Sequence, residues 1–212
     1  MKSSRKEKLI ALREFIDLET GEIKEAAFIY ENQLLERTRI KNRLDHGIKK
    51  CNKCPDMNVF RYSNNAPGWG NINSPYFFLG QSLHVTGMMT GLPFISGSGY
   101  MFDAALNIIG LKRTDVFISN VVHCHPPNNR AYTENEKHNC LPYLREEIEI
   151  VQPKMVVAMG NDAQWAVSIL GLTGRKDIRI IKVKHPASFS YSAPEQRVNW
   201  ILKLASELEK VN

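Results

Sequence analysis

Short, continuous apolar runs alternate with stretches of helical periodicity in the C-terminal two-thirds of the chain. A short, uninterrupted apolar run is typical of a strand buried on both faces. Four such runs occur, PYFFLG (75–80), DVFISN (115–120), KMVVAMG (154–160) and IRIIKVK (178–184). Alternation of buried strands with helices predicts an α/β fold with a central, mostly parallel sheet flanked by helices on both faces.

Apolar positions with helical spacing predict the helices between and after these strands. One of them opens with Thr133 and Glu136, the spacing of a capping box. The other three are expected at residues 99–110, 162–170 and 194–210.

The first 50 residues also read as helical, with a break at LETGE (18–22). We therefore expect an N-terminal helical extension, residues 1–47, ahead of an α/β domain, residues 48–212. The extension offers a surface on which a protein partner can dock.

In a parallel sheet, ligands bind beyond the carboxyl ends of the strands. The residues that follow the predicted strands are Gly80-Gln81-Ser82, Asn120, Gly160-Asn161 and His185-Pro186. Any site on this sheet should draw on this short set.

Composition is that of an ordinary globular protein, with 43% hydrophobic and 24% charged residues. No apolar run approaches the roughly 20 residues of a membrane helix, and the N-terminus lacks a signal-peptide core. We expect a cytoplasmic monomer.

The net charge of +6 would suit nucleic acid but does not require it. Between residues 37 and 53, seven basic side chains accompany one acid, Asp45. A solvated helix face explains this run most simply, and contact with a DNA backbone is the alternative.

The four cysteines form a C-x2-C pair and a C-x15-C pair, namely Cys51, Cys54, Cys124 and Cys140. Disulfides are disfavoured in a reducing cytosol. Four thiolates from two segments suit an iron–sulfur cluster or a structural zinc ion, although zinc sites usually pair two short knuckles. Metal binding is favoured over the simpler interpretation, in which Cys140 is a core thiol.

Seven motifs follow one another in a recognisable order. They are CNKCP (51–55) with Arg61, PGWGN (67–71), FFLGQSLH (77–84), GLPFISGSG (91–99), SNVVHCHPPNNR (119–130), Cys140 and KHPAS (184–188). In this order the chain resembles the family-4, iron–sulfur type of uracil-DNA glycosylase from about residue 48 to the end. The resemblance implies that the four cysteines hold a [4Fe-4S] cluster.

The resemblance also implies roles for residues of the substrate site. Phe94 corresponds to the aromatic residue that stacks on a flipped base, although it would otherwise read as a core residue. Asn120 corresponds to the residue that pairs with uracil, and His185 to the one that stabilises the departing base. Gly80 and Gln81 follow the first strand and belong to the same pocket.

For DNA, the HPASFS loop is expected to press into the duplex, with Ser188 gripping phosphates and Phe189 as a wedge. A partly buried loop aromatic is an equally good interpretation of Phe189. Arg130 is a candidate for contact with the DNA backbone.

The clearest departure from the family pattern is GQSLH (80–84), where the family has GEAPG, so that Gln81 stands in place of a glutamate. A glutamine orients water but cannot take its proton. The leading hypothesis is a monofunctional glycosylase that excises uracil or a modified uracil from DNA, with catalytic His185, Gln81 and Asn120. The alternative is a catalytically silent member that binds DNA, a modified base or a protein.

Overall fold

The structure is a computed structural model that describes residues 22–57, 65–95 and 97–211. The chain divides into two units, and the boundary between Ile40 and Lys41 lies inside the first described helix, α2 (Glu22–Lys49). The second unit, residues 41–212, contains the sheet and the candidate sites.

Within the described residues, the sheet has five strands in the order β1-β3-β2-β4-β5. Strands β2 to β5 are parallel to one another, and β1 pairs antiparallel with β3 at one edge. Their bounds are β1 Trp69–Gly70, β2 Tyr76–Gly80, β3 Phe117–Asn120, β4 Met155–Met159 and β5 Arg179–Val183. The predicted α/β class with a mostly parallel sheet is confirmed, and the four predicted strands are β2 to β5.

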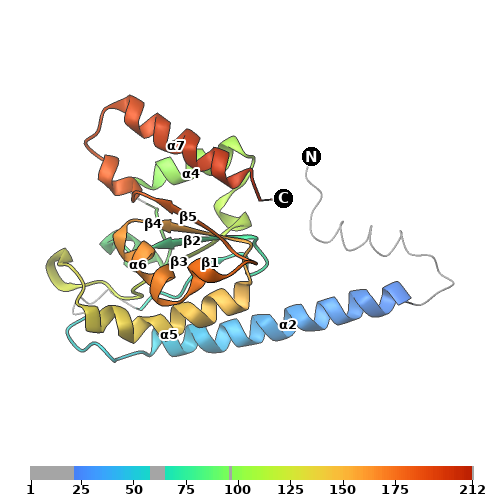
Figure 1. Cartoon of the computed structure of the whole chain (residues 1–212). Coiled ribbons are helices and arrows are strands. Elements are labelled where there is room, and N and C mark those ends of the chain that lie inside the picture. The colour runs from blue at the N-terminus through green and yellow to red at the C-terminus, as the bar shows by residue number, and fades with distance from the viewer. Residues whose placement is uncertain (1–21, 58–64, 96, 212) are drawn as a thin grey trace. The chain divides into compact units, whose positions relative to one another are not determined.

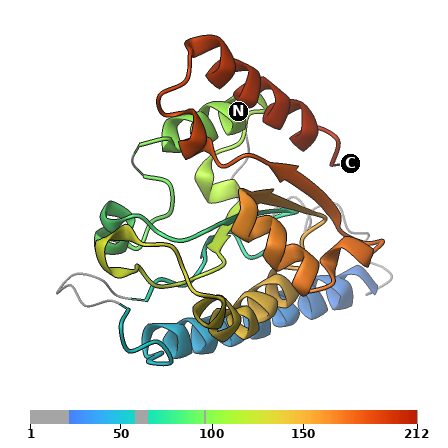
Figure 2. The ribbon, with the colours of Figure 1, turned by 60° about the vertical axis from the view of Figure 1, so that its left-hand side comes forward.

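Helices cover both faces of the sheet (Figure 1). The helices α4 and α7 lie on one side and α5 and α6 on the other, as the turned view also shows (Figure 2). Their bounds are α3 Val85–Thr90, α4 Gly99–Ile108, α5 Glu134–Val151, α6 Asn161–Ile169 and α7 Pro194–Leu208. The capping box expected at Thr133 and Glu136 is present at the start of α5.

Successive strand residues point to opposite faces, which divides the core into two layers. Phe77 and Leu79 of β2 pack with side chains of α5 and α6. Between them in sequence, Phe78 packs on the other face, where its ring meets Phe102 of α4 at 4.8 Å. Because β2 and β4 are apolar on both faces, their sequences show continuous apolar runs.

The N-terminal prediction is confirmed in part. The second of the two expected helices is α2, and the first lies outside the described residues. Within α2, one residue of the basic run departs from a solvated face: Lys41 is buried, pairs with Asp45 and donates to the Gly68 carbonyl at 2.9 Å. None of the helices in the described part of the chain is long and apolar enough to span a membrane.

Candidate active site

A cavity of about 530 Å³ opens at the carboxyl edge of the parallel strands. Residues that follow three different strands line it, together with residues of the segment between α3 and α4. Four of the side chains predicted for a substrate site meet there, namely Gln81, Phe94, Asn120 and His185. The strand-end rule and the motifs thus lead to one cavity.

Asn120 ends β3 and is only 4% exposed. Among the described residues, no protein group hydrogen-bonds its side-chain amide, which leaves both amide atoms for a ligand. Gly80, its neighbour across β2 and β3, explains how the amide fits. A Cβ atom on Gly80 would lie 2.6 Å from Asn120 Oδ1 and 3.1 Å from Phe94 Cζ, so only glycine leaves this space.

Phe94 has a left-handed backbone with φ of 54°, which is uncommon for a bulky residue and costs about 1–3 kcal/mol. The Arg113 guanidinium offsets this strain, because it donates to the carbonyls of both Pro93 and Phe94 while it pairs with Asp103 at 2.5 Å. The ring is stacked on Phe102 at 5.4 Å, and one edge of the cavity is therefore a fixed aromatic surface.

His185 lies just after β5, with its ring centroid 5.8 Å from that of Phe94. Its Nδ1 accepts a hydrogen bond from the Ala187 backbone N–H at 3.2 Å. Burial lowers the pKa of His185 below its usual value, which favours the neutral ring. Since Nδ1 is the acceptor, the proton of the neutral ring resides on Nε2, and His185 presents an N–H donor.

Gln81 is exposed at the rim of the cavity and is held from outside it. Its Nε2 donates to Asp162 Oδ2 at 2.5 Å, and Asp162 Oδ1 lies 3.3 Å from Lys137 Nζ. Sequence reasoning missed Asp162, although it stands two residues beyond Gly160 at a strand end. A carboxylate in the first turn of the helix after a strand was the available signal.

The four cysteines line a second cavity of about 290 Å³ in the same unit. Cys51 and Cys54 come from the segment after α2, Cys124 from the turn after β3, and Cys140 from α5. Asn65 and Asn139 contact two of the sulfur atoms, at 3.3 and 3.4 Å. No group of three or more His, Cys, Asp or Glu side chains spaced to hold a metal ion occurs within the part of the chain that the structure describes.

The residues predicted to contact DNA have different surroundings. Ser188 is exposed. The Arg130 guanidinium forms two hydrogen bonds with the Glu136 carboxylate, at 2.9 and 2.6 Å.

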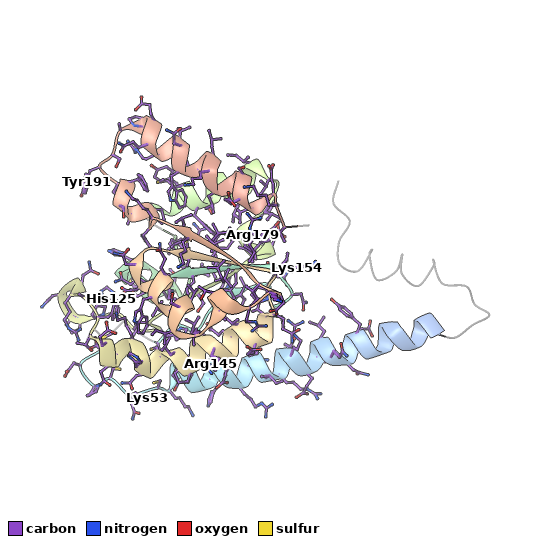
Figure 3. All side chains as sticks on the ribbon, viewed as in Figure 1. Lys53, His125, Arg145, Lys154, Arg179 and Tyr191 are labelled. Atoms are coloured by element: carbon purple, nitrogen blue, oxygen red, sulfur yellow. The ribbon has the colours of Figure 1, made fainter. Side chains whose placement is uncertain are left out.

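Phe189, the predicted wedge, is partly buried, with its ring 6.5 Å from that of Trp200, as its simpler interpretation held. The Phe189 ring would have to leave this packing to enter a duplex, and its role as a wedge stays a prediction. Two residues further on, Tyr191 is completely exposed and projects from the turn before α7 (Figure 3).

The α/β fold has a cavity at the carboxyl edge of its sheet, where proteins of this class bind their ligands, and the comparison with known families identifies the class. The family model of the uracil DNA glycosylase superfamily matches residues 67–209, and the chain belongs to this superfamily.

Individual relatives narrow the comparison. The type-4 uracil-DNA glycosylase of Pyrobaculum aerophilum is 36% identical over 143 residues, which cover 67% of this chain and 70% of that protein. The type-4 enzyme of Saccharolobus solfataricus is 37% identical over 170 residues, which cover 71% of this chain and 77% of that protein. These similarities confirm the resemblance found in the motifs.

A solved structure supports the fold alone. SMUG2 of Pedobacter heparinus superposes with a TM-score of 0.55 at 13% identity, covering 82% of this chain and 98% of that one.

Proposed function

We propose that this protein is a uracil-DNA glycosylase of the base-excision repair type, which hydrolyses the bond between uracil and deoxyribose in DNA. The observation that carries the proposal is the convergence of Phe94, Asn120, His185 and Gln81 on one cavity. The similarity to type-4 uracil-DNA glycosylases over two-thirds of the chain supports it.

Recognition of the base falls to Phe94 and Asn120. A base within a duplex is out of reach, so the nucleotide must be flipped into the cavity, where its ring stacks on Phe94. The Asn120 amide accepts a hydrogen bond from uracil N3–H and donates one to O4. Cytosine presents the opposite donors and acceptors at these atoms and is rejected.

His185 stabilises the leaving group. When the bond from N1 to C1′ breaks, its electron pair remains on the base, and negative charge develops at O2. The Nε2–H of neutral His185 donates a hydrogen bond to this oxygen. Removal of one such donor typically costs about 10²–10³ in rate.

Gln81 orients the water. Its amide oxygen accepts a hydrogen bond from a water molecule that attacks C1′ as positive charge builds on the sugar. The proton released by this water passes to solvent, because an amide cannot take it. In an oxocarbenium-like transition state the sugar carbon is already strongly electrophilic, so the attacking water does not need a strong general base.

The loop after His185 is our candidate for the DNA contact. We propose that Ser188, which is exposed, contacts a phosphate. Tyr191, with its ring free, replaces Phe189 as the aromatic that fills the space left in the stack.

We propose that Cys51, Cys54, Cys124 and Cys140 hold a [4Fe-4S] cluster. The proposal is supported by the donor set, because four thiols from three segments line one cavity, although their sulfur atoms are not drawn together as metal ligands in this structure. When bound, the cluster supplies structural cross-linking between segments, since all four ligand positions are cysteine. These side chains then anchor the turn after β3 that continues from Asn120.

The test of function is uracil release from single- and double-stranded oligonucleotides under single-turnover conditions. We expect excision by the full chain and a loss of about 10²–10³ in the His185→Ala variant. His46→Ala, a change at an exposed histidine in α2, is the matched control and should excise like the wild type. Binding of uracil-containing DNA without excision would instead support the silent binding module.

The test of the cluster is chemical analysis with absorption spectroscopy of the purified chain. We expect about four irons and four inorganic sulfides per chain, with a visible absorption band that Cys140→Ser diminishes. One zinc ion per chain and no sulfide would replace the cluster with a zinc site.

A further inference from the structure

Gln81 is the residue at which the cavity differs most from its family pattern, and its amide has only one chemically sensible orientation. A carboxylate accepts hydrogen bonds and cannot donate them. The amide nitrogen of Gln81 must therefore face Asp162, at 2.5 Å, and the amide oxygen points away from it.

Asp162 is itself held in place. Its second oxygen lies 3.3 Å from the ammonium of Lys137, which is buried on α5 and also pairs with Glu134. The Lys137 ammonium lies 4.5 Å from the ring centre of Trp165, one turn along α6 from Asp162. Lys137, which is itself held by Glu134 and Trp165, thus fixes the carboxylate that receives the Gln81 amide.

We propose that Asp162 is a positioning residue for excision: it clamps Gln81 so that the amide oxygen, and not the amide nitrogen, meets the attacking water. This inference rests on the proposed function. The attacking water needs an acceptor, because a lone pair of its oxygen must face C1′ while its O–H groups point away from that carbon. Asp162 does not line the cavity and acts through Gln81.

The clamp has a consequence for the glutamate that the family pattern carries at this position. In Gln81→Glu alone, the new carboxylate would face Asp162 across a hydrogen-bond distance, and the two would repel. In Gln81→Glu combined with Asp162→Asn, the new amide donates to the new carboxylate. One carboxylate oxygen is then left as an acceptor for the water.

The experiment is a double-mutant cycle on the full chain, with single-turnover uracil excision, affinity for abasic-site DNA and thermal unfolding as readouts. We expect Asp162→Asn to slow excision about tenfold, because a neutral amide offers Gln81 a donor as well as an acceptor. Gln81→Glu should slow excision by at least as much and lower the Tm by roughly 2–4 °C. The double variant should recover both the rate and the Tm relative to Gln81→Glu, with the affinity for abasic-site DNA unchanged throughout.

Asp177→Asn is the matched control, since Asp177 is also paired with a basic side chain, Arg175, but lies outside the cavity. It should leave excision unchanged. If the effects of the two site changes simply multiply, with no rescue in the double variant, the proposed role of Asp162 is wrong and the proposed glycosylase function is unaffected. If no variant releases uracil although the Tm values show the rescue, the proposed function fails, and the role of Asp162 in excision fails with it.

Discussion

The contact between Gly80 and Asn120 gives the sharpest test of how the base is recognised. In Gly80→Ala, the added methyl carbon would lie 2.6 Å from Asn120 Oδ1. A carbon–oxygen contact relaxes at about 3.3–3.6 Å, so the amide oxygen has to retreat by roughly 0.7–1.0 Å from its position. The Phe94 ring, whose Cζ would be 3.1 Å away, must also give way slightly.

A displacement of this size matters more for excision than for folding. Misplacement of a recognition group by about 1 Å can cost 10²-fold in rate. Overpacking of a well-packed site typically costs about 1–3 kcal/mol of stability, which a domain of this size can tolerate. We expect Gly80→Ala to remain folded and to excise uracil about 10²-fold more slowly.

The assay is single-turnover excision, paired with thermal unfolding of the same preparations. Gly47→Ala is the control, because Gly47 is exposed in α2 and an added Cβ atom meets nothing within 4 Å. That change should leave excision unaltered and stabilise the helix by up to about 1 kcal/mol. Excision by Gly80→Ala at the wild-type rate would refute the reasoning, since it would mean that Asn120 need not hold its observed position.

Three further outcomes follow from the site. Replacement of Arg113 by lysine keeps the pairing with Asp103 but loses the two-pronged hold on the backbone at Phe94, and we expect excision at subsaturating DNA to fall about tenfold, with iron content as a check on folding. The pKa of His185 is lowered by burial, so the excision rate should stay level as the pH falls through about 6.5 and drop only below that lowered pKa. In the same range His185 binds a proton less readily in the folded chain than in the unfolded chain, so the Tm should fall as the pH falls below about 6.5. A Tm that rises there would contradict the lowered pKa of His185. In Tyr191→Ala, excision from duplex DNA should fall more than excision from single strands, with the Tm unchanged, because the ring is fully exposed and a stack has to be filled only in a duplex; equal losses on both substrates would count against a wedge.

Much of the fold could be predicted because the information for it is local. The inner strands β2, β3 and β4 are buried on both faces, and each therefore shows as a largely apolar run that needs no knowledge of its neighbours. The edge strand β5 is marked by Ile180, Ile181 and Val183, although Arg179 and Lys182 are exposed. The edge strand β1 has only two residues, Trp69 and Gly70, and two residues carry no periodicity. It could be seen only after its antiparallel partner β3 was in place.

The site residues, too, could be predicted only where the information for them is local in the sequence. Asn120 and His185 follow predicted strands, so topology alone places them at one edge, whereas Phe94 depended on its motif. Asp162 and Arg113 escaped prediction because their roles are tertiary. Asp162 holds a side chain 81 positions away, and Arg113 holds a backbone segment about 20 positions away. No spacing rule within one element can report such contacts.

The burial of Lys41 bears on where an autonomous version of this enzyme can begin. The stretch shared across the superfamily starts at residue 67, yet Lys41, Leu44 and Ile48 are buried upstream of it. A chain trimmed to the shared stretch would lose these three side chains and leave the Gly68 carbonyl without its ammonium donor. The stretch that matches the superfamily and the stretch that packs as one folded unit therefore begin at different residues. The last two turns of α2 belong to the folded unit and must be kept.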